Sequence, residues 1–221
     1  MKVRFNSILN GFLVFFGFFL VSCNQITKDQ HHPFLTMVYY NEKFNSLPWG
    51  KSPQELQNLW NDYFISQNNE SIEFAIKADV KDQETIPILK ELESPYIFRF
   101  ICFYNNNQCV IFRIEKFGTE EMINEYYKNI LKNNQLIQNN LKKSSNNQHT
   151  TEAGNKILEQ YELYETDQYI IQVYISRMEF PEDVKKQKTN GITIENLSDI
   201  DLRIYSKKYN PGLNLDFFIK N

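Results

Sequence analysis

Alternation of apolar and polar residues is the feature that most restricts the fold of this chain. Residues 72–80, 169–175, 200–204 and 213–219 place apolar side chains at every second position. A period of two is typical of a strand with one face buried. The sequence therefore predicts strands in these segments, and Asn210-Pro211-Gly212 predicts a turn between the last two.

A second pair of strands is apolar on both faces. Residues 96–104 and 109–117 flank a run of asparagines, which is typical of a hairpin. Two interpretations stay open for it. Either the hairpin is central and covered on both sides, or one of its faces is exposed and awaits a partner or an apolar ligand.

Two helices are predicted from their capping residues. Ser52, Pro53 and Glu55 form a capping box with proline at the first helical position, and apolar residues follow at helical spacing. Thr119 caps the second helix, which is predicted over about residues 119–141. The acidic Glu120 and Glu121 then lie in its first turn, where the helix dipole favours them.

The order of helix, strands, helix, strands predicts an α+β fold, with one or more antiparallel sheets and two packed helices. Trp49-Gly50 and Phe117-Gly118 precede the two caps, which suggests two related α/β halves. Residues 142–155 are polar and without periodicity, so we expect an exposed linker there. The globular domain is thus expected at 41–221, with halves at 41–141 and 156–221 joined by this polar linker.

The N-terminus has the features of an export signal. Lys2 and Arg4 precede an apolar stretch at 11–21 that contains only Gly, Phe, Leu and Val. This stretch is shorter than the about 20 residues that span a bilayer, and it suits the apolar region of a signal peptide.

Leu20-Val21-Ser22-Cys23 resembles the bacterial lipobox. The resemblance implies a lipoprotein signal peptide at 1–22, cut before Cys23, and a diacylated Cys23 thiol. The lipidated N-terminus and a flexible polar tether would then occupy 23–40. The alternative is an ordinary signal peptide or signal anchor with an incidental cysteine.

Cys102 and Cys109 are the other cysteines of the chain. A hairpin folded symmetrically about Asn105-Asn106 would place them directly opposite each other. An exported protein meets an oxidising compartment, so a cross-strand disulfide is one interpretation, and two free buried thiols are the other.

The first predicted helix carries a faint family resemblance. Trp49-Gly50-Lys51-Ser52-Pro53-Gln54-Glu55-Leu56 resembles the opening helix of small envelope lipoproteins of the SmpA/OmlA kind, and is also similar to beta-lactamase-inhibitor-like modules. The resemblance covers about ten residues. It implies helices on an antiparallel sheet, and protein–protein contacts rather than catalysis.

Few residues point to catalysis. His31 and His32 fall in the expected tether and His149 in the expected linker, so no catalytic residue, metal site or cofactor is predicted from them. Two groups of carboxylates remain as candidates for paired acid–base chemistry. They are Glu115, Glu120 and Glu121, and Asp199 and Asp201.

Charge excludes one class of partner. The chain has 24 Lys and Arg against 27 Asp and Glu, without a basic cluster, which argues against nucleic acid. We therefore expect a non-catalytic lipoprotein, held outside the cytoplasm on a membrane of the cell envelope by the acyl chains on Cys23. It would act by contact with a protein partner or as a structural envelope component. The alternatives are a hydrolase of envelope polymer with paired carboxylates, and a carrier of an apolar ligand.

Overall fold

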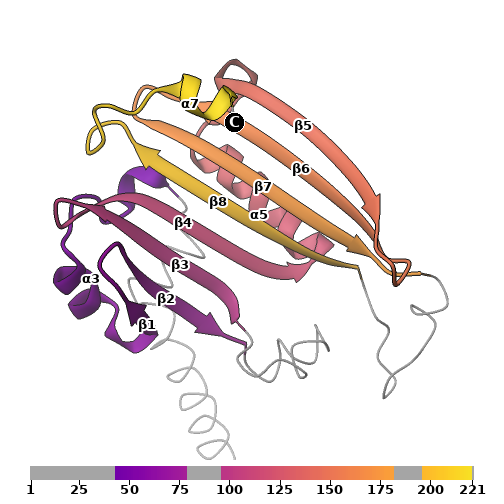
Figure 1. The fold of residues 1–221 in the computed structure, drawn as a ribbon, viewed down its shortest axis with the longest axis horizontal. Coiled ribbons are helices and arrows are strands. Elements are labelled where there is room, and N and C mark those ends of the chain that lie inside the picture. The colour runs from indigo at the N-terminus through magenta and orange to yellow at the C-terminus, as the bar shows by residue number, and fades with distance from the viewer. Residues whose placement is uncertain (1–42, 79–95, 182–195, 221) are drawn as a thin grey trace, which may run out of the picture. The chain divides into compact units, whose positions relative to one another are not determined.

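The computed structural model describes residues 43–78, 96–181 and 196–220, which form one eight-stranded antiparallel sheet (Figure 1). The strand order is β1-β2-β3-β4-β8-β7-β6-β5. The strands are β1 (Phe64–Gln67), β2 (Ser71–Lys77), β3 (Tyr96–Asn105), β4 (Gln108–Thr119), β5 (Leu141–Thr150), β6 (Lys156–Glu165), β7 (Tyr169–Glu179) and β8 (Leu197–Ser206). The fold is α+β with the sheet dominant, so the predicted antiparallel sheet is confirmed.

The helices are α3 (Pro53–Leu59), α5 (Glu120–Asn133) and α7 (Leu215–Lys220), with short 3-10 turns η2 (Phe44–Ser46), η3 (Asn61–Tyr63) and η5 (Gln138–Asn140). Of these, α5 is the one substantial helix packed on the sheet. Among the described helices, none combines the length and the apolar character that a membrane crossing requires.

Both predicted helix caps are present. The Ser52 side chain accepts a hydrogen bond from the Glu55 backbone N–H, and the Glu55 carboxylate accepts one from the Ser52 N–H in return. The Thr119 hydroxyl accepts a hydrogen bond from the N–H of Met122. Each cap satisfies backbone donors that a helix N-terminus leaves unpaired.

The helix α5 ends at Asn133, earlier than the predicted boundary near 141. The Asn134 amide donates to the carbonyl of Ile130, and Gln135 adopts a left-handed conformation with φ 53°. The Asn134 side-chain oxygen also accepts a hydrogen bond from the N–H of Phe44. These polar contacts turn the chain out of the helix although its apolar residues continue.

The helices α3 and α5 cover the same side of the sheet, which we call the helix face. The Trp60 ring, directly after α3, packs edge-on against Phe74 and Phe100, with centroids 5.1 and 5.2 Å apart. On α5, Tyr126 packs against Phe98 at 5.5 Å. Because Phe98 and Phe100 are two residues apart on β3, they point to one face.

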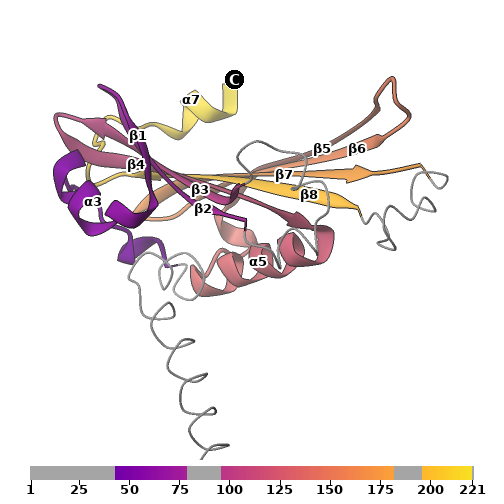
Figure 2. The same cartoon turned by 90° about the horizontal axis from the view of Figure 1, so that it is seen from below.

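The C-terminal helix α7 lies on the opposite side from α5 (Figure 2). Its Phe218 is buried against Leu163 and Ile170 and stacks edge-on against Tyr205. The predicted strand at 213–219 is therefore wrong. The Asn214 side chain accepts a hydrogen bond from the N–H of Asp216 and starts a helical turn. A short apolar run does not by itself distinguish helix from strand.

The predicted polar linker at 142–155 is also wrong. Its first part forms β5, which pairs with β6 from Leu141 to Thr150, and a tight turn joins the two strands. Residues 144–150 have exposed side chains on both faces of this strand. The strand therefore lacks the apolar alternation by which a half-buried strand is recognised.

The two predicted halves meet inside the one sheet and not across a linker. Nine consecutive residue pairs join β4 to β8, from Ile111 opposite Tyr205 to Thr119 opposite Leu197. Four strands lie on each side of this junction.

Candidate functional site

A row of charged side chains crosses the side of the sheet opposite the helix face, and we call this side the charged face. The row runs over β2, β3, β4 and β8 and consists of Glu73, Arg99, Glu115, Arg113, Asp201 and Arg203. In the described part of the chain, α7 lies over one end of this side (Figure 2) and packs on Leu163, Ile170 and Tyr205, which are not part of the row.

Arg99 joins the first three strands of the row. Its Nε lies 2.8 Å from a Glu73 oxygen on β2, and its Nη1 lies 2.9 Å from a Glu115 oxygen on β4. The carboxylates are partly buried beneath the guanidinium group, with side-chain exposures of 18% and 23% against 41% for Arg99. Donor groups of arginine therefore form the outer layer here.

Asp201 joins the last two strands of the row. It accepts two hydrogen bonds from Arg113, at 3.1 and 3.0 Å, and further ones from Arg203, the shortest of them 2.9 Å. Arg113 also forms an ion pair with Glu115. Such hydrogen bonds between fixed charges hold the planar guanidinium groups in defined orientations.

A hollow of about 380 Å³ opens on the charged face beside this row. Its lining residues are Tyr96, Ile97, Arg99, Arg113, Glu115, Lys116, Phe117, Tyr174, Asp199, Ile200 and Asp201. Charged, aromatic and aliphatic groups thus meet around one depression, a mixture common in protein interfaces.

Asp199, in the hollow, has a carboxyl group with a perturbed pKa. Burial raises its pKa to about 6, and the negative charges of Asp201 and Glu115 act in the same direction. A hydrogen bond with Ser176 opposes the increase. Because a buried carboxyl group near other carboxylates is costly to ionise, Asp199 carries a proton more readily than an ordinary aspartate.

The structure brings together three of the five carboxylates that the sequence singled out. Glu115, Asp199 and Asp201 share the hollow. Glu120 instead lies 3.6 Å from Arg177, and Glu121 is exposed in the first turn of α5.

The arginines of the charged face were missed by the sequence reasoning. Arg99 lies between Phe98 and Phe100, and Arg113 lies between Phe112 and Ile114. A charge at alternate positions of an otherwise apolar strand was the available signal, because it marks the face that is not buried in a core.

Cys102 and Cys109 are both buried as free thiols, but they are not directly opposite each other. The hairpin turns at Asn106-Asn107, both in the left-handed region, and a register shift follows Phe103. Cys102 therefore faces Phe112, and Cys109 faces Tyr104. The predicted direct opposition is wrong, because the turn lies one residue later than Asn105-Asn106 and one extra residue is then accommodated on β4.

The two thiols are nevertheless neighbours. Burial, and then a hydrogen bond with Cys109, raise the pKa of the Cys102 thiol well above its ordinary value. A disulfide between them stays a prediction.

Other predicted site residues lie apart from the hollow or outside the described residues. His149 lies exposed on β5, whereas His31, His32 and Cys23 fall outside the described ranges. Within those ranges, no group of three or more His, Cys, Asp or Glu side chains is arranged to hold a metal ion.

No protein-family model, curated protein or solved structure matches this chain.

Proposed function

We propose that this chain is a lipid-anchored lipoprotein of the bacterial cell envelope that binds a protein partner through the charged face. The observation that carries the proposal is the ordered row of ion pairs next to the hollow, on the side of the sheet opposite α3 and α5 where α7 covers only one end. The lipobox-like Leu20-Val21-Ser22-Cys23 supports the anchor. Two or three acyl chains hold a protein on a membrane durably, whereas one does not.

The exposed groups of the charged face favour a partner with acidic side chains. Arg203 and Arg99 have 46% and 41% of their side chains exposed, while Asp201 has 14%. The outer layer therefore offers N–H donors, and the carboxylates beneath hold them in place. Fixed guanidinium groups recognise carboxylates in a planar, directional way.

The two halves of the chain are, we propose, structurally related. Each consists of a helix capped by Ser or Thr and four following strands: α3 with β1–β4, and α5 with β5–β8. The strand order mirrors itself about the β4·β8 junction. An approximate two-fold relation would place the charged row close to the axis between the halves.

One observation favours a second candidate, a hydrolase of envelope polymer. Asp199, with its raised pKa of about 6, could act as a general acid beside Asp201 or Glu115. However, Arg113 and Arg203 already bind Asp201, and Arg99 and Arg113 bind Glu115. These ion pairs reduce the capacity of either carboxylate to attack or to activate water.

The third candidate, a carrier, requires a closed apolar cavity. Within the described residues, the hollow on the charged face and another at the start of α5 are each lined by several charged side chains. This lining does not support an apolar ligand.

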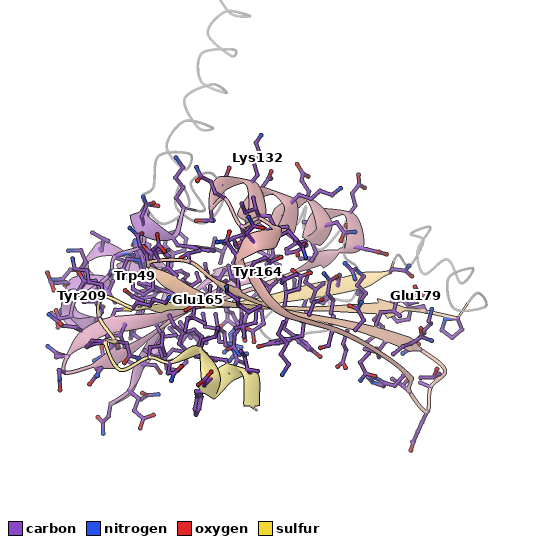
Figure 3. All side chains as sticks on the ribbon, turned by 90° about the horizontal axis from the view of Figure 1, so that it is seen from above. Trp49, Lys132, Tyr164, Glu165, Glu179 and Tyr209 are labelled. Carbon is purple, nitrogen blue, oxygen red and sulfur yellow. The ribbon has the colours of Figure 1, made fainter. Side chains whose placement is uncertain are left out.

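Site-specific photo-crosslinking in intact cells tests the proposed function. A photoreactive residue replaces Arg203 on the charged face, and a control replaces Lys132, which points away from the sheet on the outer side of α5 (Figure 3). We expect one reproducible crosslinked protein from position 203 and none from 132. Equal products from both positions, or none from 203, would refute the proposed surface.

Metabolic labelling with a fatty acid tests the anchor separately. Wild-type protein should incorporate the label and remain with the membrane fraction, and Cys23→Ser should do neither. A wild-type protein whose intact mass retains residues 1–22, or whose Cys23 sulfur carries no lipid, would refute the anchor.

A further inference from the structure

The edge strand β5 presents an uncovered row of backbone groups. It is the last strand of the sheet, and among the described residues it pairs with β6 alone. It runs along the outer margin of the sheet in Figure 1. The side chains of residues 144–150 are exposed. Such an edge offers unpaired N–H and C=O groups to which another strand can add.

From Ser144 to Thr150 this edge lacks the features by which natural sheets avoid edge-to-edge pairing, whereas the register shift after Leu141 and the side chains of Lys142 and Lys143 lie before that stretch. Those features are short strands, bulges, prolines and charged residues. β1, at the other edge, spans four residues and shifts register between Phe64 and Ser66. β5 spans ten residues and keeps a regular register from Lys143 to Thr150. Residues 144–150 contain no Asp, Glu, Lys, Arg, Pro or Gly.

The turn after β5 shows which backbone groups point outward. The Thr151 N–H donates to the Asn155 carbonyl at 2.8 Å, so this opposed pair is hydrogen-bonded. Hydrogen-bonded and non-hydrogen-bonded pairs alternate along an antiparallel ladder. Odd-numbered residues therefore bond to β6. The backbone groups of Ser144, Asn146 and Gln148 point toward the free edge.

The strand is also complementary to itself. Antiparallel pairing about a two-fold axis at Asn146 places Ser144 opposite Gln148, and Ser145 opposite Asn147. Lys143 then faces His149, and no two lysines or two acids meet. The outward groups of Ser144, Asn146 and Gln148 of one copy face outward groups of the other, because the same residues point outward in both. The Gln148 N–H donates to the Asn147 side chain at 2.9 Å in the single chain, so it exchanges that hydrogen bond for one to the Ser144 carbonyl of the second copy.

We propose that two copies of this chain associate through β5, antiparallel about a two-fold axis at Asn146, so that one sheet continues across both copies. The association depends neither on the lipid anchor nor on the partner of the charged face. It leaves the hollow on β4 and β8 accessible, because β5 lies at the far edge of the sheet.

A cysteine scan tests this geometry with the full chain in intact cells. Single substitutions Ser144→Cys, Ser145→Cys, Asn146→Cys, Asn147→Cys and Gln148→Cys are treated with a mild oxidant and resolved on a non-reducing gel. At Asn146 the two new cysteines face each other at about 5.5 Å between Cα atoms, within the range of a disulfide. At Ser144 and Gln148 the cysteine of the second copy is displaced along the strand by about 13 Å.

The expected result is a crosslinked dimer whose yield peaks at Asn146→Cys, decreases at the adjacent positions and is absent at Ser144→Cys and Gln148→Cys. Ser66→Cys on β1 and the wild type serve as controls and should give no dimer. No product from Asn146→Cys, equal yields along the scan, or a product with the mass of a different protein would each overturn the proposal.

A lysine substitution gives a second measurement without added thiols. Asn146→Lys places two like charges opposite each other, which should weaken association about fivefold in sedimentation of the detergent-purified full chain. Ser66→Lys, on the opposite edge, should leave the association unchanged. A dimer that is insensitive to Asn146→Lys would contradict the proposal, as would equal sensitivity to both lysines.

Discussion

Arg113 and Arg203 lie directly opposite each other on β4 and β8, and both bind the carboxylate of Asp201. Like charges at opposed positions destabilise a sheet. Here Glu115 is likewise opposite Asp201, and each arginine meets an acid. Arg113 reaches diagonally to Asp201 and along β4 to Glu115, and Arg203 reaches along β8 to Asp201. The junction between the two halves of the sheet therefore depends on a shared carboxylate.

Replacement of that carboxylate should destabilise the fold. Asp201→Asn removes the charge between Arg113 and Arg203, and we expect the free energy of unfolding to fall by about 1–2 kcal/mol, because the arginines are only partly buried. Urea titration measures the loss. Asp167→Asn, in the exposed turn between β6 and β7, is the matched control and should change little. Equal stability of both variants would contradict the role assigned to Asp201.

Removal of the Asp199 charge should have the opposite effect. Its pKa in the folded protein is about 6, above the ordinary 3.8. A carboxyl group with a raised pKa contributes stability below its unfolded pKa and loses that contribution as the pH rises through the folded value. The wild-type protein should therefore lose this contribution to its stability as the pH rises from about 4 to about 6.

Asp199→Asn should lack this loss, because an amide does not ionise. Above about pH 6 we expect the variant to be more stable than wild type by about 1 kcal/mol, a value that allows for solvent screening. Below about pH 4 the two proteins should be equally stable. Urea titrations of both proteins across this range provide the measurement. A constant difference at every pH would refute the raised pKa.

The buried thiols should resist alkylation. In the folded, reduced protein, Cys102 and Cys109 are fully covered, and burial disfavours the reactive thiolate of Cys102. We expect a maleimide reagent to modify both only after unfolding, as measured by intact mass. The same measurement on unreduced protein from cells tests the disulfide, since a bonded pair remains unmodified even when unfolded. Rapid alkylation of the folded protein would contradict the observed burial.

Gly50 should not tolerate a side chain. Its φ is +72°, and a Cβ atom would lie 2.7 Å from Cε1 of Tyr209. We expect Gly50→Ala to destabilise the protein by about 1–3 kcal/mol, through backbone strain and displacement of the tyrosine ring. Gly212→Ala is the matched control, because a Cβ there would meet nothing within 4 Å. Thermal unfolding compares the two, and an equal melting temperature would be inconsistent with the contact.

Local signals in the sequence predicted the elements whose stabilising contacts are local. The capping box of Ser52 and Glu55 involves residues three apart, and the structure contains it. The strands with one buried face, such as β2 and β8, show the expected period of two. The helix α7 and strand β5 were missed because distant contacts form them: Phe218 packs on Leu163, and β5 is held by pairing with β6.

The charged face could be predicted only in part. Glu115, Asp199 and Asp201 were recognised as chemically interesting, but their convergence requires the pairing of β4 with β8, which lie far apart in the chain. The arginines alternate with buried aromatic residues and could have been recognised by their period. Their shared carboxylate could not, because the diagonal contact from Arg113 to Asp201 depends on register.

The place of β8 in the middle of the sheet has a consequence for folding order. β4 pairs with a strand that begins at Leu197, 78 residues after β4 ends at Thr119. Until β8 has been made, the edge of β4 that faces away from β3 has no strand to pair with. Contacts of such large sequence separation slow folding. A chain synthesised from its N-terminus would therefore expose this edge of β4 until almost all of the chain had been made.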